Sequence, residues 1–91
     1  MRYEWDEKKR LANLGKHKID FADVPEVFRN ETITILDDRF DYKEERFVTF
    51  GLLQGRVVSV VHTEDDEVIR IISVRKATKN EQKFYFQNVG Y

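Results

Sequence analysis

The sequence contains no cysteine, a single proline and no long apolar run. The absence of cysteine excludes disulfide bonds and thiolate metal sites, and it fits a protein of a reducing compartment. No apolar stretch is long enough to span a membrane, and the opening MRYEWDEKKR lacks the apolar centre of a signal peptide. We therefore expect a cytoplasmic protein that does not enter a membrane.

The chain is long enough for one small domain. Its 91 residues are 41% hydrophobic and 36% charged, which is typical of a folded globular protein. Residues 1–19 carry six Lys or Arg and three Asp or Glu, residues 20–67 carry five and thirteen, and residues 68–91 carry five and one. Two basic ends suit a phosphate-containing partner, but the acidic middle argues against a dedicated binder of duplex DNA.

Helical patterns occur at both ends of the chain. A first helix is expected from Asp6, which can cap it, to Leu14, with Gly15 ending it. A short second helix follows near residues 21–28. It begins after Asp20 or after Asp23, and in the second case Pro25 fits in the first turn. A last helix is expected from Thr78 to about Asn88.

The middle of the chain changes to the pattern of β-strands. Four segments rich in β-branched residues predict strands, at residues 32–36, 46–53, 56–63 and 68–74. Short links join them, including a tight turn at Gln54-Gly55, so we expect an antiparallel meander. With helices on one face, the prediction is a single α+β domain containing a four-stranded antiparallel sheet.

Two histidines are the candidates for proton transfer near neutral pH. His17 lies between two lysines, in NLGKHKIDF, and is a candidate acid or base. The alternative is a surface histidine that bonds the last carbonyls of the first helix. For His62, near the end of a predicted strand, we expect a structural role. The single tryptophan, Trp5, is expected to pack the first helix against the sheet.

Three arginines in or beside strands are candidate phosphate ligands. Arg70 and Arg75 bracket the apolar IISV, and they point to opposite faces if the strand is straight. An arginine matches phosphate with a planar fork, but a carboxylate serves as well. Arg70 would then pair with Glu44, Glu45 or an acid of residues 64–67, and Arg75 with Glu81. Arg46, which opens a strand, is the third candidate. The sequence allows two strand registers, which place Arg70 on different faces.

No motif for a metal or a nucleotide is present. Asp37, Asp38 and Asp41 lack the spacing of a calcium loop. The chain has no glycine-rich phosphate loop and no nucleophile elbow. We therefore expect neither a metal nor a cofactor.

Three blocks together resemble the BrnT family of bacterial toxins from type II toxin–antitoxin modules. They are WDEKKRLANLGKHKIDF, ERFVTFG and RIISVRKATKNE, the last followed by Tyr85. They occur in the family's order and at similar spacing over nearly the whole chain. The positions that match are Trp5, Asp6, Asn13, His17, Phe21, Glu45, Arg46, Phe47, Gly51, Arg70, Ser73, Arg75, Ala77, Glu81 and Tyr85.

The resemblance implies a fold like that of the RelE-type ribonuclease toxins, and ribonuclease activity that arrests translation. It also implies a BrnA-type antitoxin, through which the complex, a possible dimer or heterotetramer, reaches operator DNA. On this basis we expect a metal-independent endoribonuclease. His17 would act as acid or base, and Arg70, Arg75 and Arg46 would hold the phosphate. Lys16, Lys76 and Lys79 would bind RNA.

Two other functions remain open at this stage. In the first, the arginines and the basic last helix only bind a protein partner, without catalysis. In the second, the two short N-terminal helices form a helix-turn-helix that binds DNA. The acidic second helix makes the latter the weaker prediction.

Overall fold

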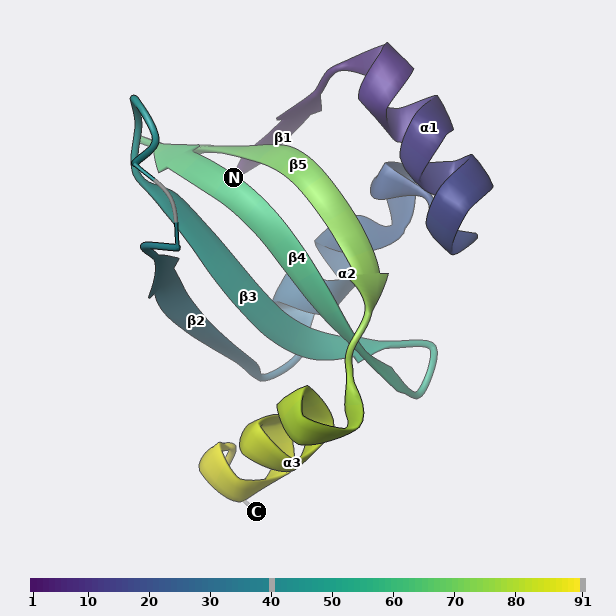
Figure 1. Ribbon diagram of the computed structural model, residues 1–91, viewed down its shortest axis with the longest axis vertical. Coiled ribbons are helices and arrows are strands. Elements are labelled where there is room, and N and C mark those ends of the chain that lie inside the picture. The colour runs from purple at the N-terminus through teal and green to yellow at the C-terminus, as the bar shows by residue number, and fades with distance from the viewer. Residues whose placement is uncertain (40, 91) are drawn as a thin grey trace.

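The computed structural model describes residues 1–39 and 41–90, where it shows three helices and five strands (Figure 1). The elements are, in chain order, β1 (Arg2–Trp5), α1 (Glu7–His17), a short 3₁₀ helix η1 (Phe21–Asp23), α2 (Val24–Arg29), β2 (Thr32–Asp37), β3 (Arg46–Leu53), β4 (Arg56–Asp65), β5 (Val68–Lys76) and α3 (Lys79–Asn88). Phe40, in the predicted loop between β2 and β3, lies outside the described residues. None of the helices described is long and apolar enough to cross a membrane.

The five strands form one mixed sheet in the order β1-β5-β4-β3-β2. The antiparallel meander of the last four strands is confirmed. The predicted total of four antiparallel strands is wrong, because β1 adds a fifth strand that runs parallel to β5. This strand is the four-residue RYEW, and its first residue pairs with Val68. Its two aromatic residues favour a strand, but so short a segment depends on its distant partner, β5, which no local pattern indicates.

The first helix is longer than predicted. Asp6 caps it as expected, and its side chain accepts a hydrogen bond from the backbone of Lys9 at 3.1 Å. The helix does not end at Gly15 but continues to His17. It ends at Lys18, whose φ of 61° is left-handed and whose N–H bonds the carbonyl of Leu14. His17 therefore lies in the last helical turn rather than in a loop.

The 3₁₀ helix η1 and the last helix, α3, begin at side-chain caps, whereas α2 has none. Asp20 accepts from the N–H of Ala22 and starts η1, which leads directly into α2. Pro25 lies in the first turn of α2, where a backbone N–H has no hydrogen-bond partner within the helix, so the N–H that proline lacks is not needed. Thr78 and Glu81 form a reciprocal capping box at the start of α3, as the position of Thr78 predicted.

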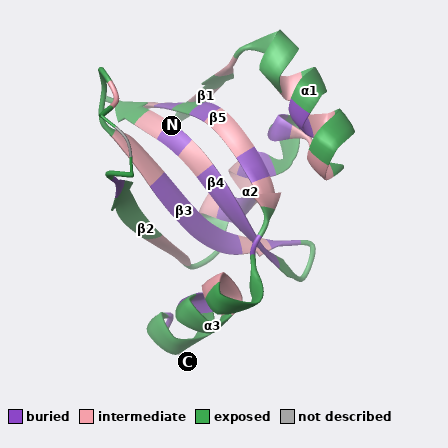
Figure 2. Ribbon diagram, in the orientation of Figure 1, coloured by how far each residue is buried: buried purple, intermediate pink, exposed green. Residues whose placement is uncertain are grey.

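The sheet buries a separate apolar cluster on each of its two faces. The buried segments of β3, β4 and β5 are seen in Figure 2. We call the face covered by η1 and α2 the helical face, and the opposite one, where α3 covers one end, the open face (Figure 1). The helical-face cluster contains Phe21, Val24, Val27, Leu53, Val58, Val60, Ile69, Ile71 and Val74. The open-face cluster contains Val48, Phe50, Val57, Ala77, Tyr85 and Val89. The sequence predicted helices on one face of the sheet, whereas helices pack against both faces.

Trp5 packs as predicted, with its ring at 6.4 Å and nearly perpendicular to that of Phe21. It anchors β1, and hence the start of α1, against the helical-face cluster.

The side chain of Asn13 attaches α1 to the edge of β5 beyond the end of β1. Its amide nitrogen donates to the carbonyls of Val74 at 2.9 Å and Ile19 at 3.1 Å, and its oxygen accepts from the N–H of Val74 at 3.2 Å. Asn13 is only 8% exposed. Its side-chain amide pairs with the N–H and the carbonyl of Val74, as the backbone of a neighbouring strand would. This contact fixes where the last turn of α1 lies relative to the end of β5.

Gly51 in β3 is required by the close approach of α2, so we expect Gly51→Ala to lower the free energy of unfolding by about 1–3 kcal/mol. An added Cβ would lie 2.7 Å from Val27 Cγ1 and 3.1 Å from Thr32 Cγ2. Urea denaturation measures the effect.

Gly15→Ala is the matched control. Nothing lies within 4 Å of its added Cβ, and a helical position favours alanine by about 1 kcal/mol. Equal stability of the Gly51 variant and the wild type would contradict the tight contact.

Candidate functional site

A β-bulge in β5 places two of the predicted site arginines on the same face of the sheet. The register between β4 and β5 shifts between residues 61 and 62, which leaves Ile72 without a partner. The extra residue reverses the alternation of side chains along the strand. Arg70 and Arg75 therefore both point to the open face, whereas a straight strand would have separated them.

Arg70 nevertheless lies far from Arg75 along the strand, at roughly 15 Å from the rise per residue. Arg70 lines a cavity whose other lining residues are Glu44, Glu45, Thr63, Glu64 and Asp65. It is exposed and makes no ion pair with the residues that the structure describes. These acidic surroundings fit the predicted alternative, in which Arg70 pairs with a carboxylate, better than they fit a phosphate site.

Arg46 lies at this same acidic end of the sheet, at the start of β3. Its guanidinium carbon is 4.0 Å from the centre of the Tyr42 ring, and its Nε is 3.8 Å from a carboxylate oxygen of Glu44. That Nε is buried and has no hydrogen-bond partner among the described residues. The arginine is thus held by a ring and a carboxylate.

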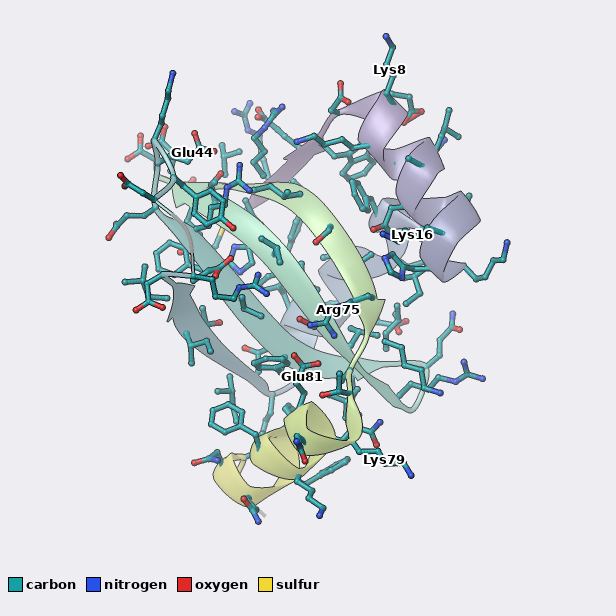
Figure 3. All side chains as sticks on the ribbon, in the orientation of Figure 1. Lys8, Lys16, Glu44, Arg75, Lys79 and Glu81 are labelled. Carbon is teal, nitrogen blue, oxygen red and sulfur yellow. The ribbon has the colours of Figure 1, made fainter. Side chains whose placement is uncertain are left out.

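Arg75 forms a two-pronged ion pair with Glu81 of α3 (Figure 3). The two hydrogen bonds measure 2.7 and 2.9 Å, and Arg75 also donates to the carbonyl of Lys76. The guanidinium lowers the pKa of the Glu81 carboxyl, and the carboxylate raises the pKa of Arg75. The predicted alternative of a pair between these residues is confirmed. It joins the end of β5 to the capping box of α3.

His17 lies at the opposite end of the sheet from Arg46 and Arg70. It lines a cavity of about 310 Å³ with Lys18, Asp23, Arg56, Lys76 and the apolar chains beside them. His17 follows Asn13 by one helical turn, so it lies on the stripe of α1 that faces the edge of β5. The cavity therefore contains one histidine and three cations, against a single carboxylate. Such a set suits an anion that undergoes proton transfer.

The structure thus brings together only some of the predicted site residues. Lys76 lines the same cavity as His17, whereas the preceding residue, Arg75, points to the other face of the sheet. Lys16, in the last turn of α1, and Lys79, at the start of α3, are exposed near this basic end (Figure 3). Arg46 and Arg70 belong to the acidic end, near Glu44.

Arg56 is the member of the cavity that the sequence did not indicate. It follows the two-residue turn of the β3–β4 hairpin, where Gln54 and Gly55 have φ values of 51° and 81°. Nothing in the sequence places this hairpin beside the end of α1. The turn itself was predictable, whereas the cavity that it shares with His17 depends on how the sheet and α1 pack.

No cluster of three or more metal-ligating side chains occurs within residues 1–39 and 41–90. Asp23 is the single carboxylate in the His17 cavity, and the neighbouring cations oppose a divalent metal ion.

His62 is fully buried on the helical face, in keeping with the predicted structural role. Its Nε2 is 2.6 Å from the hydroxyl of Thr49, and its ring packs on Phe28 and Phe47. Burial lowers the pKa of His62. The buried Nδ1 has no hydrogen-bond partner in the described part of the chain, and Glu64 lies 3.8 Å away.

We expect acid to destabilise the fold through His62. The unfolded chain takes up a proton near pH 6.5, the ordinary pKa, whereas the buried ring resists it. The stability is therefore complete above this pH and falls below it, by up to about 1.4 kcal/mol per pH unit. Urea denaturation between pH 7.5 and 5 measures the slope. His62→Phe removes the titrating group, and an unchanged slope in this variant would assign the effect elsewhere.

The helix-turn-helix alternative does not fit the structure. The second helix, α2, has six residues and buries Val24 and Val27 against the sheet. A recognition helix must present its side chains to a DNA groove.

A comparison with models of protein families gives one match that covers most of the chain. The matching family is described as the ribonuclease toxin, BrnT, of type II toxin–antitoxin systems, and the match extends over residues 5–81. It includes α1, the whole sheet after β1 and the start of α3. No curated protein matches the sequence.

Proposed function

The chain belongs to the BrnT family of ribonuclease toxins from type II toxin–antitoxin systems, and from this premise we propose that it is a metal-independent endoribonuclease of the cytoplasm. Cleavage of RNA by this enzyme would stop translation. The observation that carries the proposal is the basic cavity around His17, which holds a proton-transfer group among Lys18, Arg56 and Lys76.

In the proposed reaction, the 2′-hydroxyl oxygen of RNA attacks the adjacent phosphorus and the bond to the 5′-oxygen breaks. The products are a 2′,3′-cyclic phosphate and a 5′-hydroxyl end. One proton leaves the 2′-oxygen and one reaches the 5′-oxygen. We assign one of these transfers to His17 and the other to water.

Lys76 and Arg56 are the proposed ligands of the scissile phosphate, whose negative charge is concentrated as the bonds change. In this proposal Lys16, Lys79 and Arg75, whose side chain points to the open face, bind a neighbouring phosphate. The carboxylate of Glu81 holds the Arg75 guanidinium in place. Arg46 and Arg70 lie among acids at the other end, so we give them no part in cleavage.

RNA cleavage by the purified protein in excess chelator tests the function and the absence of a metal together. We expect cleavage to persist, with 2′,3′-cyclic phosphate ends. Cleavage that stops in chelator and returns with Mg²⁺ would overturn the metal-free reaction. A folded protein that cleaves RNA in neither condition would overturn the nuclease proposal itself.

Expression in bacteria tests the proposed toxicity. We propose that a BrnA-type antitoxin neutralises this chain and that their complex, a dimer or heterotetramer, reaches operator DNA through the antitoxin. Growth should stop on expression and resume when the antitoxin is co-expressed. Harmless expression of the folded protein would favour a module that only binds a partner, an alternative that the internal pairing of Arg75 with Glu81 supports.

A further inference from the structure

The sheet ends at β2. It is the last strand in the sheet order, so one side of its backbone faces no other strand within residues 1–39 and 41–90. Ile35 and Leu36 are 43% and 51% exposed. Soluble proteins usually block such an edge with lysine, proline or a bulge. The segment TITILD has neither residue, and its pairing with β3 is regular throughout.

A small hollow of mixed lining adjoins this edge on the open face. It has a volume of about 170 Å³, and the apolar Ile35, Val48 and Phe50 line it together with Asp37, Asp38, Arg39 and Ser59. Arg75 and Glu81 line its far side, where they already pair with each other. A strand added beside β2 would direct every second side chain toward this hollow.

The loop at the end of β2 carries an excess of acids. A second hollow there is lined by Leu36, Asp37, Asp38, Asp41, Tyr42, Lys43, Glu44 and Glu45. Asp37 is already bound by Arg39 at 2.7 and 3.0 Å, which lowers the pKa of its carboxyl. Glu44 lies 3.8 Å from Arg46, which leaves Asp38, Asp41 and Glu45 to attract a cation and to repel the phosphates of a nucleic acid.

Charge also disfavours a second copy of this chain as the added strand. In a symmetric antiparallel pairing, the residues just before β2 of one copy lie beside the acidic loop of the other. The three residues before β2 are Arg29, Asn30 and Glu31, which together carry no net charge. A second copy would therefore bring no net positive charge to the acidic loop.

We propose that β2 receives an extended segment of a partner protein as a sixth strand. The segment has apolar side chains at alternate positions, and it carries lysine or arginine where it passes Asp38 and Asp41. Backbone hydrogen bonds to β2 supply affinity, while the hollow and the acids select the sequence. This docking site lies apart from the His17 cavity, so it stands whether or not the chain cleaves RNA.

Synthetic peptides test the site on the wild-type protein. The probes are ten-residue peptides of alternating valine and threonine with two lysines at either terminus. Their binding is followed by NMR shifts of the protein's backbone amides. We expect shifts confined to β2, the acidic loop and the hollow. Replacing the lysines by glutamates should weaken binding at least about tenfold, and N-methylation of the amides that face β2 should abolish it.

Any of three results would overturn the proposal. The first is that the NMR shifts lie outside β2. The second is that the glutamate peptide binds as well as the lysine peptide. The third is that the protein alone forms a concentration-dependent dimer that protects the β2 amides, because a second copy would then be the occupant.

A matched pair of variants adds a second measurement. Leu36→Lys introduces a blocking lysine at the edge and should reduce binding of the lysine peptide at least about tenfold. Leu11→Lys makes the same change at a leucine of α1 with similar exposure, 55%, and should leave binding unchanged. Equal binding by both variants would rule out the β2 edge.

Discussion

RNA cleavage by the purified protein is expected to fall by about 10²–10⁴-fold when His17 is replaced by alanine, the range typical of a lost acid or base. His17 is half-buried in the last turn of α1, in the cavity that also holds Arg56 and Lys76. It is the histidine of the chain that can reach a substrate, because His62 is fully buried. The measurement is single-turnover cleavage of an RNA oligonucleotide in chelator.

Lys8→Ala is the matched control for this variant. Lys8 is exposed in the first turn of the same helix, at the end remote from the cavity (Figure 3). We expect its cleavage rate to stay within about twofold of the wild type, because it lies beyond the reach of phosphates held in the cavity. Cleavage by His17→Ala at the wild-type rate, with the variant folded, would remove His17 from the mechanism.

The phosphate ligands should show a different kinetic signature. Arg56→Ala and Lys76→Ala are expected to reduce kcat/KM and to make the remaining binding less sensitive to salt, because each removes a phosphate contact. Arg70→Ala, at the acidic end, should leave both quantities unchanged. A loss with Arg70→Ala equal to that with Lys76→Ala would move the active site to the open face.

The largest expected loss of stability outside the apolar clusters follows from Asn13→Ala, at about 2–4 kcal/mol. The amide of Asn13 satisfies both backbone groups of Val74 and the carbonyl of Ile19. Truncation leaves the buried groups of Val74 without partners, and each such group costs about 1–3 kcal/mol. A domain of this size has only about 5–10 kcal/mol of stability, so the variant should be near its folding limit at 37 °C. Thermal and urea denaturation measure the change.

Asn88→Ala is the control of identical chemistry. Its amide donates a single bond to the carbonyl of Phe84, within the last turn of α3, and the residue is exposed. Water replaces that bond, so a change within about 0.5 kcal/mol is expected. Similar losses for the two asparagine variants would contradict the role given to Asn13. A stable Asn13→Ala variant that has lost cleavage would show that Asn13 positions His17 without holding the fold together.

The elements with strong local signals were predictable. The four strands of the meander, the turn at Gln54-Gly55 and the caps at Asp6 and Thr78 depend on neighbours in sequence, and the structure contains all of them. The missed strand, β1, depends on a distant partner, because it forms beside β5. The end of α1 was missed for a local reason, since Lys18 rather than Gly15 takes the left-handed conformation that ends the helix.

The residue types of the candidate site were also readable, but their grouping was not. His17 was predicted as a catalytic acid or base and Lys76 as an RNA-binding residue, and the two share a cavity. The expected group of His17 with all three arginines is not present, since Arg46 and Arg70 lie at the opposite end of the sheet. Arg56 shares a cavity with His17 because the fold brings the β3–β4 turn and the end of α1 to the same end of the sheet, and no local sequence pattern indicates this.

The sequence by itself determined the family, the α+β class and the polarity of the molecule, because acids and bases are already sorted into blocks along the chain. Only the tertiary structure decided which charges meet. A single bulge at Ile72 put Arg70 and Arg75 on one face, and the amide of Asn13 set the end of α1 beside the exit of β5. Both depend on register and packing between distant segments, where one extra residue reverses every side chain that follows it.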